Sequence, residues 1–292
     1  METTTRPAPM KRPSCYNMDQ IVGEPVSVLD HGFIRLVDYM GDESSIVQAA
    51  RVSYGLGTDT PARDAALIRY LLRNHHTSPF EMCEVKLHVK LPIFVARQWI
   101  RHRTASVNEV SGRYTALPTE FYVPAEEQVA KQAKDNKQGR GVSVDFDSTN
   151  YIKKTMQEDA EAAFARYNEY LTVFDLAKEL ARNNLPLSTY TEFYWKIDLH
   201  NLMHFLRLRT DPHAQYEIRA YADVMQWMVA GWMPNLHKAF VDYRLRSHTF
   251  SGPEMDVLEK YLSSQTPMEL PDVPGNSERE NKVFREAFSR FE

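Results

Sequence analysis

The spacing of apolar and polar residues changes along the chain, and these changes outline the expected elements. In EVKLHVKL (84–91), valine and leucine alternate with lysine and histidine, which predicts a strand with one buried face. The aromatic, β-favouring stretch TYTEFYWKI (189–197) predicts a second strand. Residues 26–37 are apolar on both sides of an Asp30-His31-Gly32 turn and therefore predict a hairpin.

Other stretches repeat their apolar residues every three or four positions, which is the spacing of a helix. The expected helices open at residues that commonly cap or start a helix: Asp42, Thr60-Pro61, Pro92, Asp198 and Asp211-Pro212. The helix after Pro92 should continue to Arg103, the longest helix should span 151–182, and the last should end near Gly231. Their apolar faces hold Ile46, Val47 and Ala50; Leu67, Ile68, Leu71 and Leu72; Ile152, Met156, Ala160, Ala163, Phe164, Tyr167, Leu171 and Phe174; and Leu199, Leu202, Met203 and Leu206.

Segments without such periodicity divide the chain. Residues 1–24 predict a mobile arm, 125–150 a charged surface excursion, and 104–114 a loop broken by glycine. Strands and helices follow one another without regular βαβ alternation, which predicts an α+β fold: an antiparallel or mixed sheet with helices packed around it. We expect a single domain over 25–250 and a C-terminal extension over 251–292 whose role the sequence leaves open.

Composition limits the classes of function. The chain has 292 residues, 43% hydrophobic and 25% charged, which is typical of a globular protein. Its net charge of 35 − 39 = −4 does not favour nucleic-acid binding, and no apolar run approaches the roughly 18 residues of a membrane helix. The N-terminus carries prolines and charges rather than a signal peptide. With Cys15 and Cys83 as the only cysteines, we expect a soluble protein of the cytoplasm.

Positive charge is concentrated locally in RHRTASVNEVSGRY (101–114). Arginine binds phosphate and carboxylate in a bidentate manner, and serine hydroxyls and the amides around a glycine add donors for the same ligands. The stretch is either a solvated basic surface or an anion site. It follows an apolar strand and helix, and a second stretch, LRLRTDPHAQYEIR (206–219), has a similar make-up. Two such stretches in an acidic protein favour a nucleotide-sized pocket.

The order R-H-R-x-x-S-x-N-E-x-S-x-R-Y at 101–114 resembles the signature of the flavin-dependent thymidylate synthases. The resemblance extends from Val28 to Tyr243 through AARVSYG, HTSPFE, FVARQWIRHR, NLPLSTYTEFYW and LRTDPHAQYE. It does not cover the N-terminal arm, the excursion at 125–150 or the tail after residue 251.

The resemblance implies an enzyme that reductively methylates dUMP to dTMP, with methylenetetrahydrofolate as the one-carbon donor and NADPH as the reductant of bound FAD. It implies a homotetramer whose active sites draw on more than one chain. The family positions that contact FAD match Ser78, Arg101, His102, Arg103, Glu109 and, on a helix where another residue type is expected, His204. Those that bind dUMP match Gln98, Arg101, Ser111, Gly112, Arg113, Arg182 and Arg209. The expected catalytic residues are Arg209, Ser111, Arg113 and His76, and Tyr114 lies close to His76. His200, like His204, occupies a helix position where an Arg- or Asn-type flavin contact is expected.

Several alternatives remain open on the sequence. Cys83 could be a nucleophile, although its flanking strand favours a buried thiol. His75, His76, Glu81 and His88 lack the spacing of metal ligands, so we expect no metal. A module that binds single-stranded RNA, a flavin-dependent NADPH oxidase, and a methylase of another uridine nucleotide are the competing functions.

Overall fold

A five-stranded antiparallel sheet forms the centre of the protein, seen here in a computed structural model. The structure describes residues 12–52, 60–134, 138–263, 273 and 278–288. The strands follow the order β1-β2-β3-β7-β4 across the sheet. Their bounds are β1 Pro25–Val28, β2 Gly32–Met40, β3 Glu84–Pro92, β7 Tyr190–Asp198 and β4 Ser106–Glu109. The expected hairpin and the two expected strands are confirmed, whereas the loop expected over 104–114 contains β4.

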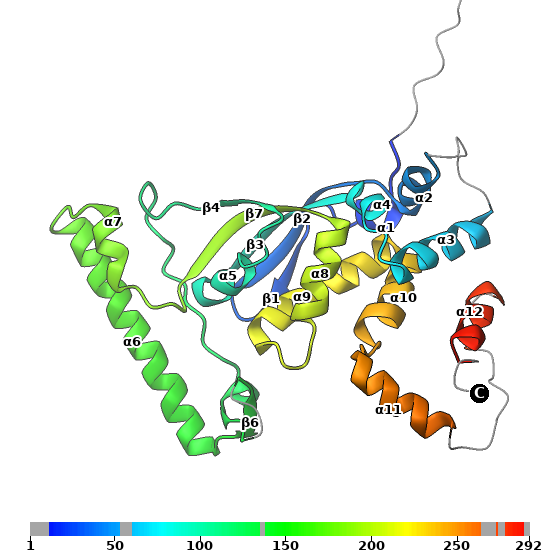
Figure 1. Ribbon diagram of the computed structural model, residues 1–292. Helices are drawn as coiled ribbons and strands as arrows, with labels where there is room; N and C mark the ends of the chain where they lie inside the picture. Colours follow the sequence, from blue (N-terminus) through cyan, green and yellow to red (C-terminus); the bar gives the residue numbers. More distant parts are fainter. Residues whose placement is uncertain (1–11, 53–59, 135–137, 264–272, 274–277, 289–292) are drawn as a thin grey trace, which may run out of the picture. The chain divides into compact units, whose positions relative to one another are not determined.

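Helices cover the apolar face of this sheet. In β3, Val85, Leu87, Val89 and Leu91 are buried, and the residues between them are half-buried on the other face. The helices α5 (Ile93–Trp99), α8 (Leu199–Arg209) and α9 (Tyr216–Trp232) pack against the strands (Figure 1). The alternating pattern therefore directs apolar side chains into the sheet–helix interface, and the α+β class is confirmed.

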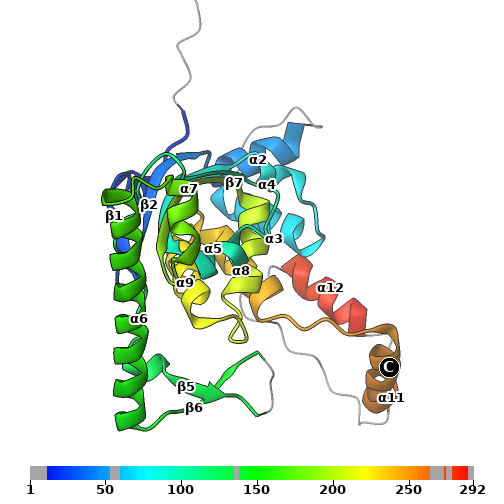
Figure 2. The same ribbon diagram turned by 90° about the vertical axis from the view of Figure 1, so that its left-hand side faces the viewer.

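The remaining elements lie around this core. The helices are α1 Tyr16–Asp19, α2 Glu43–Arg51, α3 Pro61–Arg73, α4 Ser78–Glu81, α6 Phe146–Thr172, α7 Lys178–Ala181 and α10 Pro234–Phe240. Short 3-10 turns occur at η2 Glu126–Gln128 and η3 Arg182–Asn184, and a π-helical turn at η4 Val241–Leu245. The strands β5 (Ala130–Gln132) and β6 (Arg140–Ser143) form a separate hairpin beside the N-terminal end of α6 (Figures 1 and 2).

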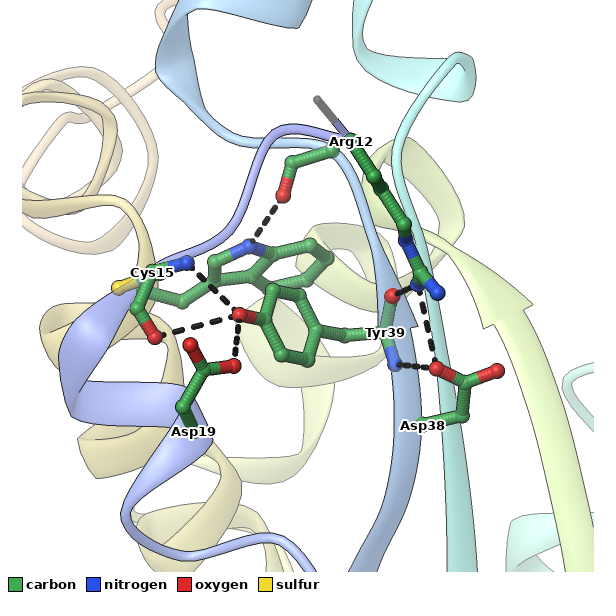
Figure 3. Close-up of polar contacts among 7 residues, drawn as sticks. Arg12, Cys15, Asp19, Asp38 and Tyr39 are labelled. Atoms are coloured by element: carbon green, nitrogen blue, oxygen red, sulfur yellow. Dashed lines mark hydrogen bonds and ion pairs between the residues drawn. The ribbon is translucent and has the colours of Figure 1, made fainter. Parts of the chain in front are cut away.

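The described part of the expected N-terminal arm, residues 12–24, makes defined contacts with the rest of the chain. Met18 on α1 is only 1% exposed. The hydroxyl of Tyr39 donates to Asp19 at 2.5 Å and accepts from the backbone N–H of Cys15 at 2.7 Å, and Arg12 pairs with Asp38 at 3.2 Å (Figure 3). The segment is held because it buries a methionine and gives partners to a buried tyrosine. Residues 1–11 lie outside the described range.

Two helices start at other residues than expected because of side-chain caps. The longest helix, α6, starts at Phe146 rather than near residue 151, since Asp145 accepts from the backbone N–H of Ser148 at 2.9 Å. It ends at Thr172 rather than near residue 182. Phe174 lies beyond its end and is 64% exposed. Asp211 caps a turn rather than a helix, and α9 begins only at Tyr216.

The C-terminal residues belong to a second compact unit, Asp242–Glu292. It contains α11 (Gly252–Ser263) and α12 (Glu278–Phe288), and the hydroxyl of Tyr243 donates to Glu280 within it. No helix in either unit, as far as the structure describes them, is long and apolar enough to cross a membrane.

Gly32 is the tightest position at the start of β2. A Cβ atom there would lie 2.0 Å from the Tyr221 hydroxyl, 2.7 Å from the Val28 carbonyl oxygen and 2.8 Å from the Lys90 carbonyl oxygen. We expect Gly32→Ala to lower the free energy of unfolding by about 1–3 kcal/mol, because two of these atoms belong to the backbone. The measurement is the urea midpoint.

Gly231→Ala is the matched control. Its Cβ would lie 3.6 Å from Asn17 in an open helical position, so this variant should be neutral or more stable than the wild type. Equal midpoints for the two variants would contradict the close approach at Gly32.

Candidate nucleotide site

The end of α5 is fixed on the sheet by Trp99, which is 0% exposed. The helix stops at Trp99 rather than continuing to Arg103, and the backbone N–H of His102 donates to the Trp99 carbonyl at 3.0 Å. The chain therefore turns directly after buried Trp99, where the charged residues begin. Arg101 and Arg103 are exposed on this turn, and His102 is half-buried between them.

Arg209, the last residue of α8, reaches this turn. Its Nε donates to His102 Nε2 at 3.1 Å, and its terminal nitrogen donates to the backbone carbonyl of Gln98 at 3.2 Å. Both acceptors are uncharged, and across the described ranges no carboxylate lies within ion-pair distance of Arg209. Burial lowers the pKa of Arg209 from its ordinary value. A half-buried guanidinium without a counterion is a strong donor to an anionic or carbonyl oxygen.

His102 is held neutral by its surroundings. Burial, and then the charges of Arg209 and His204, lower the pKa of His102 to about 4. The imidazole therefore accepts from Arg209 at neutral pH instead of repelling it. His204, five residues before Arg209 on α8, has its ring centroid 5.8 Å from that of His102. Burial, followed by the charge of Arg207, lowers the pKa of His204 as well.

Glu109, also a residue of the 101–114 signature, is the last residue of β4. Its carboxylate accepts from the hydroxyl of buried Thr191 at 2.7 Å, and the next backbone N–H, that of Val110, donates to the Glu192 carbonyl at 2.9 Å. Pairing of β4 with β7 thus fixes where Glu109 and the following residues leave the sheet.

A second cluster forms around Gly112. A Cβ there would lie 3.1 Å from a terminal nitrogen of Arg182, so the Arg182 side chain crosses directly over the glycine. Ser111 caps this turn by accepting from the backbone N–H of Arg113 at 3.3 Å. Arg113 pairs with Glu179 at 2.8 Å, and both side chains are exposed. The sequence placed Ser111, Gly112, Arg113 and Arg182 at one ligand, and the structure brings these four together.

His76 and Ser78 occupy a third place. His76 lies exposed after α3 with its ring 5.8 Å from that of Tyr70, and Ser78 is the first residue of α4. The helix α4 packs against α8, which carries His204 and Arg209. The Gly112 cluster lies apart from α8, because α7 and α8 stand well separated along the sheet in Figure 1. One chain therefore does not gather all the expected dUMP contacts at one point.

Comparison with known proteins identifies the family of this chain. Residues 35–235 match the family described as "Thymidylate synthase complementing protein". A flavin-dependent thymidylate synthase from Wolbachia pipientis wMel is 55% identical over 255 residues, which cover 87% of this chain and 89% of the relative. The chain belongs to the flavin-dependent thymidylate synthase family.

Other relatives extend this relationship. The flavin-dependent thymidylate synthase of Ruegeria pomeroyi is 49% identical over 286 residues, 97% of this chain and 94% of that protein. A crystal structure of the UMP/dUMP methylase PolB from Streptomyces cacaoi, bound with 5-Br dUMP, superposes with a TM-score of 0.69 at 34% identity. It covers 76% of this chain and 100% of its own. The family, its flavin and its methyltransferase chemistry, expected from the signature, are confirmed.

Beside the site lie residues that the sequence did not single out. Gln215 accepts from the side-chain amide of Gln98 at 2.5 Å and donates to buried Glu217 at 2.8 Å. Gln215 and Glu217 lie in the second arginine-containing stretch, 206–219. The sequence could have indicated Glu217, because a glutamate next to Ile218 falls on the buried face of a helix. Arg140, which also contacts Glu217, comes from the excursion at 125–150 and carried no such signal.

Two alternatives from the sequence can be compared with the structure. Cys83 is 0% exposed, and burial followed by the charge of Asp42 raises the pKa of its thiol to about 12. A thiol so far from ionisation is a poor nucleophile, and the buried structural thiol is confirmed. Within the described residues, no three histidine, cysteine or acidic side chains gather as metal ligands.

The low pKa of His102 makes stability depend on pH. The ordinary pKa of 6.5 applies to the unfolded chain and a value of about 4 to the folded one, so the unfolded chain binds more protons between these limits. Stability should therefore fall as pH drops from about 6.5 to about 4. We expect His102→Gln to reduce this dependence in flavin-free protein, measured as the difference between urea midpoints at pH 7 and pH 5. An unchanged difference in the variant would show that His102 is not buried as described.

Proposed function

We propose that the protein converts dUMP to dTMP, taking its one-carbon unit from methylenetetrahydrofolate and its reducing equivalents from NADPH through bound FAD. The observation that carries the proposal is the half-buried Arg209, which contacts only neutral groups and sits beside the family signature. The relatives named as flavin-dependent thymidylate synthases support the same reaction.

The substrate would be held by the Gly112 cluster of one subunit together with residues from another. Ser111, Gly112 and Arg113 form a turn with backbone donors, and Arg182 lies across it, which is suited to a phosphate group. Gln98 and Arg101 would reach the same dUMP from a neighbouring subunit. The separation of the two groups within one chain supports a homotetramer with shared active sites.

The residues around the α5 turn suit FAD. Arg101, His102 and Arg103 offer donors to a pyrophosphate, and Glu109 offers an acceptor to a hydroxyl. Exposed His204 lies on α8, and exposed Ser78 lies on α4, which packs against α8. The absence of ion pairs to Arg101 and Arg103 in the described ranges leaves both guanidinium groups available for an anion. FAD, when bound, supplies the hydride for reduction of the transferred carbon; the protein supplies binding and orientation.

The proposed chemistry uses an arginine at the uracil ring. Carbon 5 of uracil is a weak nucleophile, because its attack on the one-carbon donor withdraws electrons from the ring. Loss of the N3 proton to solvent pushes electrons into the ring and places negative charge on the uracil oxygens, and a guanidinium held in place beforehand stabilises that charge relative to the neutral ring. We assign this role to Arg209, with Ser111, Arg113 and Arg182 anchoring the nucleotide and His76 near the flavin and folate. The contribution of one such donor is roughly 3–4 kcal/mol.

The two cysteines support a proposal for the compartment. Cys15 and Cys83 are both free. We place the reaction in the cytoplasm, where reduced thiols persist.

A second candidate substrate has its own support. The structural neighbour from Streptomyces cacaoi is named a UMP/dUMP methylase and was crystallised with 5-Br UMP as well as 5-Br dUMP. Methylation of UMP by this chain would use the same arginines, because UMP differs from dUMP only by a ribose hydroxyl.

The reaction is tested with purified protein. We expect a yellow protein that oxidises NADPH and releases tritium from dUMP labelled at carbon 5, with lower rates on labelled UMP. Equal or higher rates on UMP would favour the second candidate. A colourless protein that stays apo when FAD is added would reject both.

The assignment of Arg209 is tested against the cysteine alternative. Arg209→Ala should lower kcat by about 100-fold or more with the fold intact, because the developing charge loses its donor. Cys83→Ala should retain turnover, since its thiol is buried with a raised pKa. Tritium release per bound flavin is the measurement, and circular dichroism checks the fold. Equal loss in both variants would point to a cysteine mechanism.

A further inference from the structure

Glu217 is a buried carboxylate outside the expected set of site residues. Its side chain is 2% exposed near the start of α9. Three side chains donate to it: the Tyr122 hydroxyl at 3.0 Å, the Arg140 guanidinium at 2.5 Å and the Gln215 amide at 2.8 Å. Burial followed by the charge of Glu217 raises the pKa of Tyr122, so that phenol remains a donor. A buried carboxylate is tolerated only with such complete pairing.

The charge partner comes from a distant segment. Arg140 lies on β6, in the hairpin that forms part of the 125–150 excursion. It also donates to Gln128 at 2.9 Å and lies 5.9 Å from the centre of the Tyr216 ring. The excursion is therefore not a structureless insertion where the structure describes it, because Arg140 ties it to the first turn of α9.

The carboxylate is linked to the α5 turn by two side-chain amides. Glu217 can only accept hydrogen bonds, so the Gln215 amide must turn its nitrogen towards Glu217 and its oxygen away. That oxygen accepts from the Gln98 amide nitrogen at 2.5 Å. The backbone carbonyl of Gln98 in turn accepts from Arg209 at 3.2 Å. The negative charge thus fixes the orientation of both amides.

We propose that Glu217 is a positioning residue for nucleotide binding, and that Arg140 on the hairpin supplies its counter-charge. Through Gln215, the carboxylate holds the Gln98 amide in one of its two flipped orientations, so that the same polar atoms face the substrate. The inference rests on the proposed function, in which Gln98 contacts dUMP.

Glu217→Gln is the direct test. The variant keeps the shape but places an NH₂ group where one oxygen accepted a hydrogen bond, so the three donors cannot all be paired and the Gln215 amide loses its fixed orientation. We expect KM for dUMP to rise roughly tenfold, with flavin content and NADPH oxidation without dUMP unchanged. A merely structural role would lower the unfolding temperature without this separation of KM from flavin binding.

Arg140→Ala and Arg140→Lys test the same link from the hairpin, and they remain available if Glu217→Gln fails to fold. Arg140 is 35% exposed, so its truncation opens the Glu217 carboxylate to water and lowers stability, and Arg140→Lys keeps a positive charge beside that carboxylate. Arg140→Ala should raise KM for dUMP in the same direction as Glu217→Gln, and Arg140→Lys, which keeps the charge, should recover most of the affinity.

Glu158→Gln is the matched control. It removes a carboxylate from an exposed pair with Lys154 at 3.7 Å on α6 and should match the wild type. If KM for dUMP in Glu217→Gln and Arg140→Ala equals that of this control, the proposal is rejected. Wild-type protein that releases no tritium would instead reject the proposed function. The positioning would then be decided by calorimetric dUMP affinity in the same variants, and absence of dUMP binding by the wild type would reject it too.

Discussion

The packing of Trp99 is the contact on which the arrangement of the site depends. Its indole meets the rings of Trp195 at 5.1 Å, Phe205 at 4.8 Å and Tyr221 at 6.0 Å, which come from β7, α8 and α9. One side chain therefore joins the sheet to both helices that carry polar site residues. The buried indole nitrogen has no hydrogen-bond partner in the described structure, an omission that costs about 1–3 kcal/mol. Aromatic packing of this extent offsets such a cost.

From this anchor, electrostatics determines what the site can accept. The chain turns directly after Trp99 and presents alternating arginine and histidine, while α8 ends with Arg209 beside them. Because His102 is neutral, Arg209 keeps its donors aligned without repulsion from a second cation. The result is local positive charge in a chain of net charge −4, which suits the proposed binding of a nucleotide at this place.

Local patterns in the sequence were enough to predict the strands at 84–91 and 189–197 and the helix capped by Asp198, because each depends on neighbouring residues. The signature at 101–114 identified the family for a different reason: many residue types are fixed within a short span. What could not be predicted depends on contacts between distant segments. The crossing of Arg182 over Gly112 joins residues 182 − 112 = 70 positions apart, and the pairing of Arg140 with Glu217 joins residues 77 positions apart. Neither leaves a periodic signal.

The position of β4 has a consequence of its own. It is an outermost strand, four residues long, and all four of its residues, Ser106 to Glu109, are exposed. Long apolar strands at such a place invite pairing with other chains and the growth of aggregates. Here the short segment that belongs to the family signature also leaves little free backbone for such pairing. Replacing its serine, asparagine or glutamate by β-branched apolar residues would thus endanger solubility as well as recognition.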